Sequence, residues 1–235
     1  MSNQIKIDYF FRFKSGDKRE ISLLIDENTL ALVSKTIITP PFWSELAFHQ
    51  CSVCPLDARL HSHCPIAAHL SDIVDSFGAY FSYETVTVEV SDSQRRYYKE
   101  TSLQDGLGSL MGIIMATGGC PVMEPLRPLV RFHLPFASME ETEFRIVSMY
   151  LIAQYFREKN GEKPDWSLDG LQVIYDKVGE VNRSFAERLR SATSKDASVN
   201  ALIVLDCFAK GVPFAVRTTL RDYEKFFESY ITNLS

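Results

Sequence analysis

Four cysteines in two separate stretches place the strongest constraint on how this chain can fold. They are Cys51, Cys54, Cys64 and Cys120. The first two form a C-x-x-C pair, which can supply two ligands from a single tight turn, and Gly118-Gly119 directly precedes the distant Cys120. Zinc ions and iron–sulfur clusters usually take four thiolates in a tetrahedral arrangement. The pattern therefore predicts that the two stretches meet at one soft-metal site.

Histidines near these cysteines provide alternative ligands. The candidates are His49, His61, His63 and His133. Any of them can replace a thiolate in a Cys₃His zinc site, and this surplus of imidazole slightly favours zinc. Three of the four cysteines directly precede proline, which is typical of iron–sulfur loops. Zinc is slightly preferred, and an iron–sulfur cluster stays open.

Other interpretations of the cysteines do not require a metal. Cys51 and Cys54 could form a thiol–disulfide redox pair, but the strand–C-x-x-C–helix context of such pairs is missing. All four could instead be small side chains buried in loops. Cys207 lies in an apolar segment and is expected in the core.

The candidate site favours a structural or sensory role over catalysis, because four protein thiolates leave no position open for a substrate. Three alternatives stay open: an iron–sulfur redox protein, a zinc-dependent hydrolase with an open site at His133, and a metal-free domain that binds another protein through a helix at 167–194. The sequence contains no phosphate loop and no G-x-G-x-x-G, H-E-x-x-H or G-x-S-x-G motif.

The first half of the chain has the pattern of two β-hairpins separated by a loop and a helix. Apolar residues alternate from Ile5 to Phe13, which is the period of a half-buried strand. Pro65 suits the first turn of a helix, because a helix start does not need its missing N–H. Strands are expected at 5–13, 20–25, 82–90 and 95–101, and a helix at 65–77.

The second half has mostly helical periodicity. Ser138 and Glu141 have the spacing of a capping box at a helix start. The four prolines between Pro121 and Pro135 predict an extended or irregular segment, and Gly211 is expected to end a helix. Helices are expected at 103–116, 138–159, 167–194, 202–208 and 218–231. The prediction is an α+β fold, with an α+β part at 1–102 and a helical part at 103–235 packed together through Cys120.

Composition excludes several classes of partner. The net charge of −5 provides no general basic field for nucleic acid or anionic lipid. The longest apolar segment, at 110–116, is too short to cross a bilayer. The N-terminus lacks the basic and apolar regions of a signal peptide, which predicts a cytoplasmic protein.

Several motifs together resemble those of a bacterial protein family of unassigned function. They are Cys51-x-x-Cys54-Pro-Leu-Asp, Cys64-Pro, Gly119-Cys120-Pro and His133-Leu-Pro-Phe. The similarity covers about residues 5–160 and includes the opening hairpin. It implies a bacterial, cytosolic protein, and it implies no particular activity.

Overall fold

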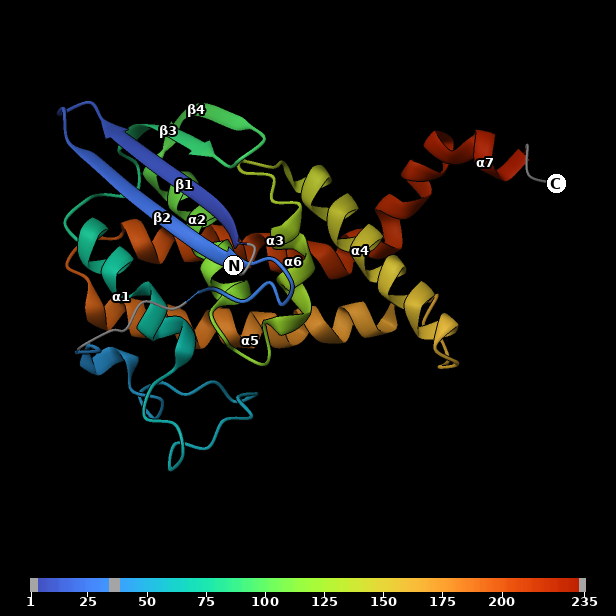
Figure 1. Ribbon diagram of the computed structural model, residues 1–235, viewed down its shortest axis with the longest axis horizontal. Helices are drawn as coiled ribbons and strands as arrows, with labels where there is room; N and C mark the ends of the chain where they lie inside the picture. The colour runs from blue at the N-terminus through green and yellow to red at the C-terminus, as the bar shows by residue number, and fades with distance from the viewer. Residues whose placement is uncertain (1–3, 34–38, 233–235) are drawn as a thin grey trace.

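An antiparallel sheet of four strands forms one face of the protein (Figure 1). The computed structural model describes residues 4–33 and 39–232, with only the backbone described at 213–219. The strands are β1 (Gln4–Phe13), β2 (Lys18–Asp26), β3 (Thr85–Ser91) and β4 (Arg96–Ser102), in the order β2-β1-β3-β4. The two expected hairpins are present, and the pairing of β1 with β3 joins them into one sheet.

The inner face of the sheet is apolar because alternate residues point toward the helices. Phe11 and Val88 on this face are fully buried. Two helices cover it, α1 (Pro65–Phe77) and α2 (Leu103–Thr117). The ring of Phe77 from α1 lies edge-on to that of Phe11, with 4.9 Å between the ring centroids. Gly106 brings α2 close to the sheet, since a Cβ there would lie only 2.8 Å from Cγ2 of Val88.

Two long helices lie side by side beyond α2, namely α5 (Asp169–Ala192) and α6 (Ala197–Glu224) (Figure 1). A further helix, α4 (Met139–Lys159), contacts α6. The shorter elements are η1 (Phe42–Ser44), η2 (Glu124–Leu126), α3 (Arg127–Arg131), η3 (Lys225–Phe227) and α7 (Glu228–Thr232). One hydrophobic cluster extends from Ile7 in the sheet to Val212 in α6, so both halves of the chain contribute to it.

The α+β architecture is confirmed, and so is the capping box that begins α4. The side chain of Ser138 accepts a hydrogen bond from the N–H of Glu141, and the Glu141 carboxylate accepts one from the N–H of Ser138. This reciprocal pair satisfies two of the N–H groups that a helix start leaves without partners.

Two predictions for the second half were wrong in part. The expected break at Gly211 is absent, because α6 continues through Pro213 to Glu224. Gly211 instead permits close approach of α4, since a Cβ there would lie 3.1 Å from Sδ of Met139. The proline-rich segment is not wholly irregular: η2 and α3 each have proline at a first-turn position, where proline is tolerated.

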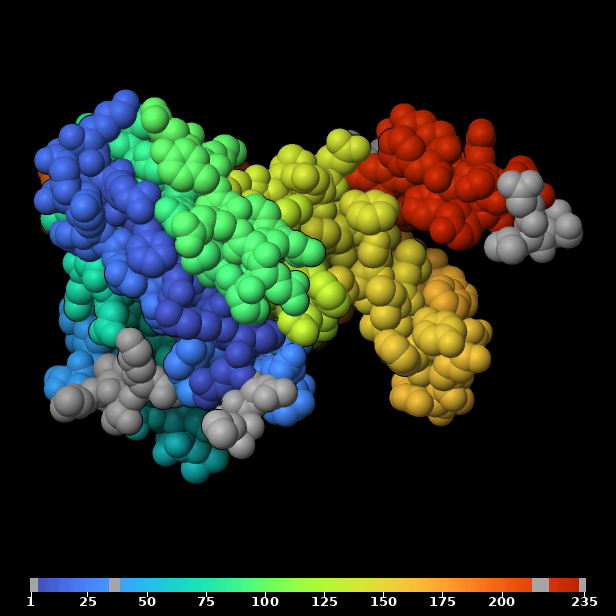
Figure 2. Space-filling model, turned by 45° about the horizontal axis from the view of Figure 1, so that its top comes forward, coloured from blue at the N-terminus to red at the C-terminus, as the bar shows by residue number. Residues whose placement is uncertain are grey.

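The C-terminal end of the chain projects from the body of the molecule, where η3 and α7 extend beyond the contact of α6 with α4 (Figures 1 and 2). Phe226 and Tyr230 are largely exposed on this projection. Among residues 4–33 and 39–232, no helix has both the length and the apolar character needed to cross a membrane.

The close approach of α2 to the sheet gives a test of the fold. Gly106→Ala places a methyl group 2.8 Å from Val88 and 3.0 Å from Phe11, so it should lower the free energy of unfolding by about 1–3 kcal/mol. Gly179→Ala in α5 is the matched control, because a Cβ there meets no atom within 4 Å. That change should raise stability by about 0.5–1 kcal/mol. Urea denaturation measures both, and equal effects would contradict this account of Gly106.

Candidate metal centre at the four cysteines

The structure brings the four cysteines to one small cavity of about 20 Å³, called here the cysteine cavity. Cys51 and Cys54 lie in the loop between η1 and α1, Cys64 is the N-cap of α1, and Cys120 follows α2. All four are free thiols. Residues far apart in the sequence thus line the same cavity between the loop, α1, α5 and the segment after α2.

Local backbone geometry positions each sulfur. The N–H of Cys54 donates to the carbonyl of Cys51 at 3.0 Å, which closes the C-x-x-C turn. Cys64 is anchored by its N–H, which donates to the carbonyl of Ser44 at 2.8 Å. Gly119 has a φ of +91°, a conformation that favours glycine, and this turn directs the chain into Cys120.

Backbone N–H groups point at two of the sulfurs. Cys64 accepts hydrogen bonds from the N–H groups of Ile66 and Ala67, in the first turn of α1. Cys120 accepts them from Val122 and Met123. Burial raises the pKa of both thiols, and these N–H donors partly offset the rise. Such donors stabilise a thiolate more than a thiol, so the backbone favours the charged form at both positions.

The pKa of the Cys51 thiol is strongly raised. Burial, followed by the charge of Cys64, raises its pKa to about 11, against a hydrogen bond from Ser184 that lowers it. Cys54 and Cys120 also raise the pKa of Cys51, which places all four sulfurs within electrostatic reach of one another. At neutral pH the Cys51 thiol is therefore protonated in the free protein, and a metal would have to displace its proton.

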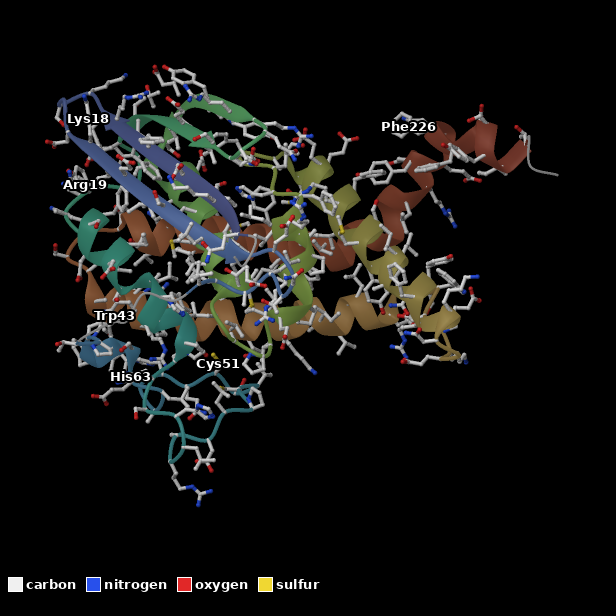
Figure 3. The ribbon with its side chains drawn as sticks, in the orientation of Figure 1. Lys18, Arg19, Trp43, Cys51, His63 and Phe226 are labelled. Carbon is white, nitrogen blue, oxygen red and sulfur yellow. The ribbon has the colours of Figure 1, made fainter. Side chains whose placement is uncertain are left out.

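Arg188 of α5 is a buried cation beside the thiols, with 1% of its surface exposed. Its Nη1 donates to the carbonyls of Trp43 and Glu45 at 2.7 Å, and its Nη2 to that of Leu46 at 3.0 Å. Figure 3 shows Trp43 and Cys51 on the same side of α5, where this loop lies. Within the described chain Arg188 forms no ion pair with a carboxylate. A buried cation is costly unless an anion balances it, and thiolates are the nearest groups able to do so.

The histidines lie elsewhere, and no described histidine lines the cysteine cavity. His49 and His61 are exposed, and Nδ1 of His63 lies 3.0 Å from Oγ of Ser44. His133 lines a different, larger cavity. Its Nε2 is 2.7 Å from the hydroxyl of Tyr9.

The four thiols line one cavity, but they are not arranged around a single position that a metal ion could occupy. In the part of the chain that the structure describes, no group of three or more His, Cys, Asp or Glu side chains is arranged to hold a metal ion. The chemistry of the donors suits a soft metal, since four thiols, N–H donors to sulfur and a buried cation occur together. Ligation of a single ion would require the sulfurs to draw closer than they are here.

Comparison with known proteins places the chain in a family. A family model described as a domain of unknown function (DUF6901) matches residues 7–228. The chain belongs to this family. The DUF6901 match extends past residue 160 and covers most of the helical part as well as the sheet. The comparisons with curated proteins and with solved structures gave no match. Membership of the DUF6901 family brings no activity with it, so any functional argument rests on the site.

Arg188 and Ser184 were missed by sequence analysis. The signal was present: Val181, Phe185 and Leu189 define the buried face of α5, and Arg188 falls on that face in place of an apolar residue. The prediction for Cys207 was wrong, because its side chain is exposed. Cys207 follows the buried Leu202 by five residues in α6. Each residue turns the helix by about 100°, so Cys207 points away from the face on which Leu202 is buried.

Arg188→Met should destabilise the protein strongly. The change removes three hydrogen bonds and leaves carbonyls of the loop buried without donors, so the free energy of unfolding should fall by at least about 3 kcal/mol. Arg190→Met is the control on the same helix, because its exposed ion pair with Glu187 contributes only about 0.5 kcal/mol. Chemical denaturation compares the two. Similar stabilities would show that Arg188 does not hold the loop.

Proposed function

We propose that the four cysteines bind a soft-metal centre as thiolates, either a zinc ion or an iron–sulfur cluster. The observation that carries the proposal is the meeting of Cys51, Cys54, Cys64 and Cys120 at one cavity next to the buried guanidinium of Arg188. Both kinds of centre take four thiolates, so the donor set is compatible with either.

Charge supports this proposal. A zinc ion with four thiolates carries a net negative charge, and so does a thiolate-ligated iron–sulfur cluster. Arg188 and the N–H groups that point at Cys64 and Cys120 supply the positive partners that such a centre needs. With neutral thiols, the hydrogen-bond partners of Arg188 in the described chain are backbone carbonyls, which carry no net charge.

The proposed role of the centre is structural or sensory. With four ligands from the protein, no coordination position is left for a substrate. A centre at this place would join the loop before α1 to the segment after α2, and binding free energy would then add to the stability of the fold.

Metal analysis tests the proposal directly. Protein purified with and without oxygen should contain about one zinc, or up to about four irons, per chain. Absorption near about 400 nm that bleaches on reduction identifies a cluster, and a colourless loaded protein identifies zinc. Serine at Cys51, Cys64 or Cys120 should lower the metal content several-fold.

Cys207→Ser is the matched control, because Cys207 is exposed and lies outside the cysteine cavity. It should keep the metal content of the unaltered protein. Less than about 0.3 metal per chain in both preparations, together with a fully folded protein, would refute the proposal. The metal-free interaction domain would then be the better hypothesis.

Metal affinity should depend steeply on pH. Burial holds the pKa of Cys51 at about 11 and raises those of Cys64 and Cys120, so these thiols are protonated below pH 8. Each thiol that becomes a ligand releases one proton, so affinity should fall by roughly tenfold per pH unit for each proton released as the pH is lowered from 8 to 6. Competition with a chelator of known affinity measures this slope. An affinity independent of pH would exclude thiolate ligation.

A further inference from the structure

A second cavity of about 450 Å³ lies among α2, α3, α4, α5 and α6. Its size is within the range of about 300–1,000 Å³ that is usual for sites that bind small molecules. The walls are mostly apolar and include Ile113, Met123, Leu129, Ile146, Val178 and Leu205. This apolar cavity adjoins the cysteine cavity. Met123 and Val178 line the apolar cavity, and their near neighbours Val122 and Val181 line the cysteine cavity.

Arg145 of α4 supplies a positive charge to the wall of the apolar cavity. Its Nη2 donates to the carbonyls of Leu129 and Phe132, at 2.8 and 2.9 Å. In the described chain Arg145 belongs to no ion pair. The nearby carboxylate of Glu141 is occupied at the N-terminus of α4 by the N–H of Ser138. The guanidinium therefore faces the cavity without a direct anionic partner.

Tyr175 of α5 places a hydroxyl in the same wall. Its side chain is only 6% exposed, and its hydroxyl has no hydrogen-bond partner among the described residues. Burial raises the pKa of Tyr175, so the hydroxyl keeps its proton and acts as a donor. The charge of Arg145 influences this pKa, which places the two groups near each other. A hydroxyl that lines a cavity and bonds to no described residue is free to donate to an acceptor inside that cavity.

The other titratable groups of the wall do not neutralise Arg145. Burial lowers the pKa of His133 to about 3, so its ring is neutral. Asp105 is held at the start of α2 by the hydroxyls of Thr101 and Ser102. Lys99 adds a second positive charge, with its ammonium 5.8 Å from the ring centroid of Phe136. The wall thus holds two cations, Lys99 and Arg145, against one carboxylate, Asp105, and this excess of positive charge favours an anion.

We propose that the apolar cavity binds an amphipathic carboxylic acid, with its carboxylate on Arg145 and Tyr175 and its hydrocarbon chain along the apolar wall. One guanidinium and one hydroxyl match the two oxygens of a single carboxylate. A cationic head group would be repelled by Arg145, and a neutral head group would leave its charge unbalanced. The proposal rests on neither the cysteines nor a metal.

Three ligands with the same chain test the head group. Isothermal titration calorimetry with dodecanoate, dodecanol and dodecylamine at pH 7.4 compares a carboxylate, an alcohol and an ammonium. Dodecanoate should bind with a dissociation constant in the micromolar range, dodecanol about tenfold more weakly, and dodecylamine more weakly still. Equal affinities for the three, or no binding of dodecanoate up to about 1 mM, would overturn the proposal.

Tyr175→Phe is the decisive variant, because the hydroxyl that it removes bonds to no other residue in the described part of the chain. It should weaken dodecanoate about tenfold, leave dodecanol unchanged, and keep the melting temperature. Tyr230→Phe, on the exposed face of α7, is the matched control and should change nothing. Arg145→Gln should weaken dodecanoate more than tenfold, although it also removes two hydrogen bonds to carbonyls. Unchanged dodecanoate binding by Tyr175→Phe would refute the assigned head-group site.

Discussion

The contact of Arg188 with the carbonyls of Trp43, Glu45 and Leu46 is the interaction on which the cysteine cavity depends. The loop before α1 has little regular structure, and its carbonyls would otherwise be buried without donors. One guanidinium satisfies several of them at once, because its N–H groups diverge in a fixed plane. Arg188 thereby attaches the segment that precedes Cys51 to α5, beside the cavity that the four thiols line.

Local patterns in the sequence were sufficient for most of the architecture. The alternation of Ile5–Phe13 and the capping box at Ser138 each depend on neighbours a few residues away, and both predictions agree with the structure. Gly211 misled the prediction because α6 is held by its contacts with α2, α4 and α5, which outweigh the local preference to end there. A glycine at a helix crossing and a glycine at a helix end look alike in one sequence.

The candidate site was only partly predictable. The spacing of Cys51 and Cys54 predicted that both lie in one turn. The meeting of Cys120 with them is a contact between distant segments, and the sequence supported it only as a hypothesis. Arg188 could have been noticed as a charge on an apolar face, yet its three acceptors lie in a loop whose path no local pattern specifies. The apolar cavity was not predicted, because it forms only where several helices meet and no single segment encodes it.

The segment after α2 serves two cavities with adjacent residues. Val122 faces the cysteines, Met123 faces the apolar cavity, and both N–H groups point back at Cys120. On α5, Val178 lines the apolar cavity and Val181 lines the cysteine cavity. A displacement of this wall toward one cavity necessarily reshapes the other. If both were filled, the two occupants would be thermodynamically linked, and each would change the affinity of the other by the same factor.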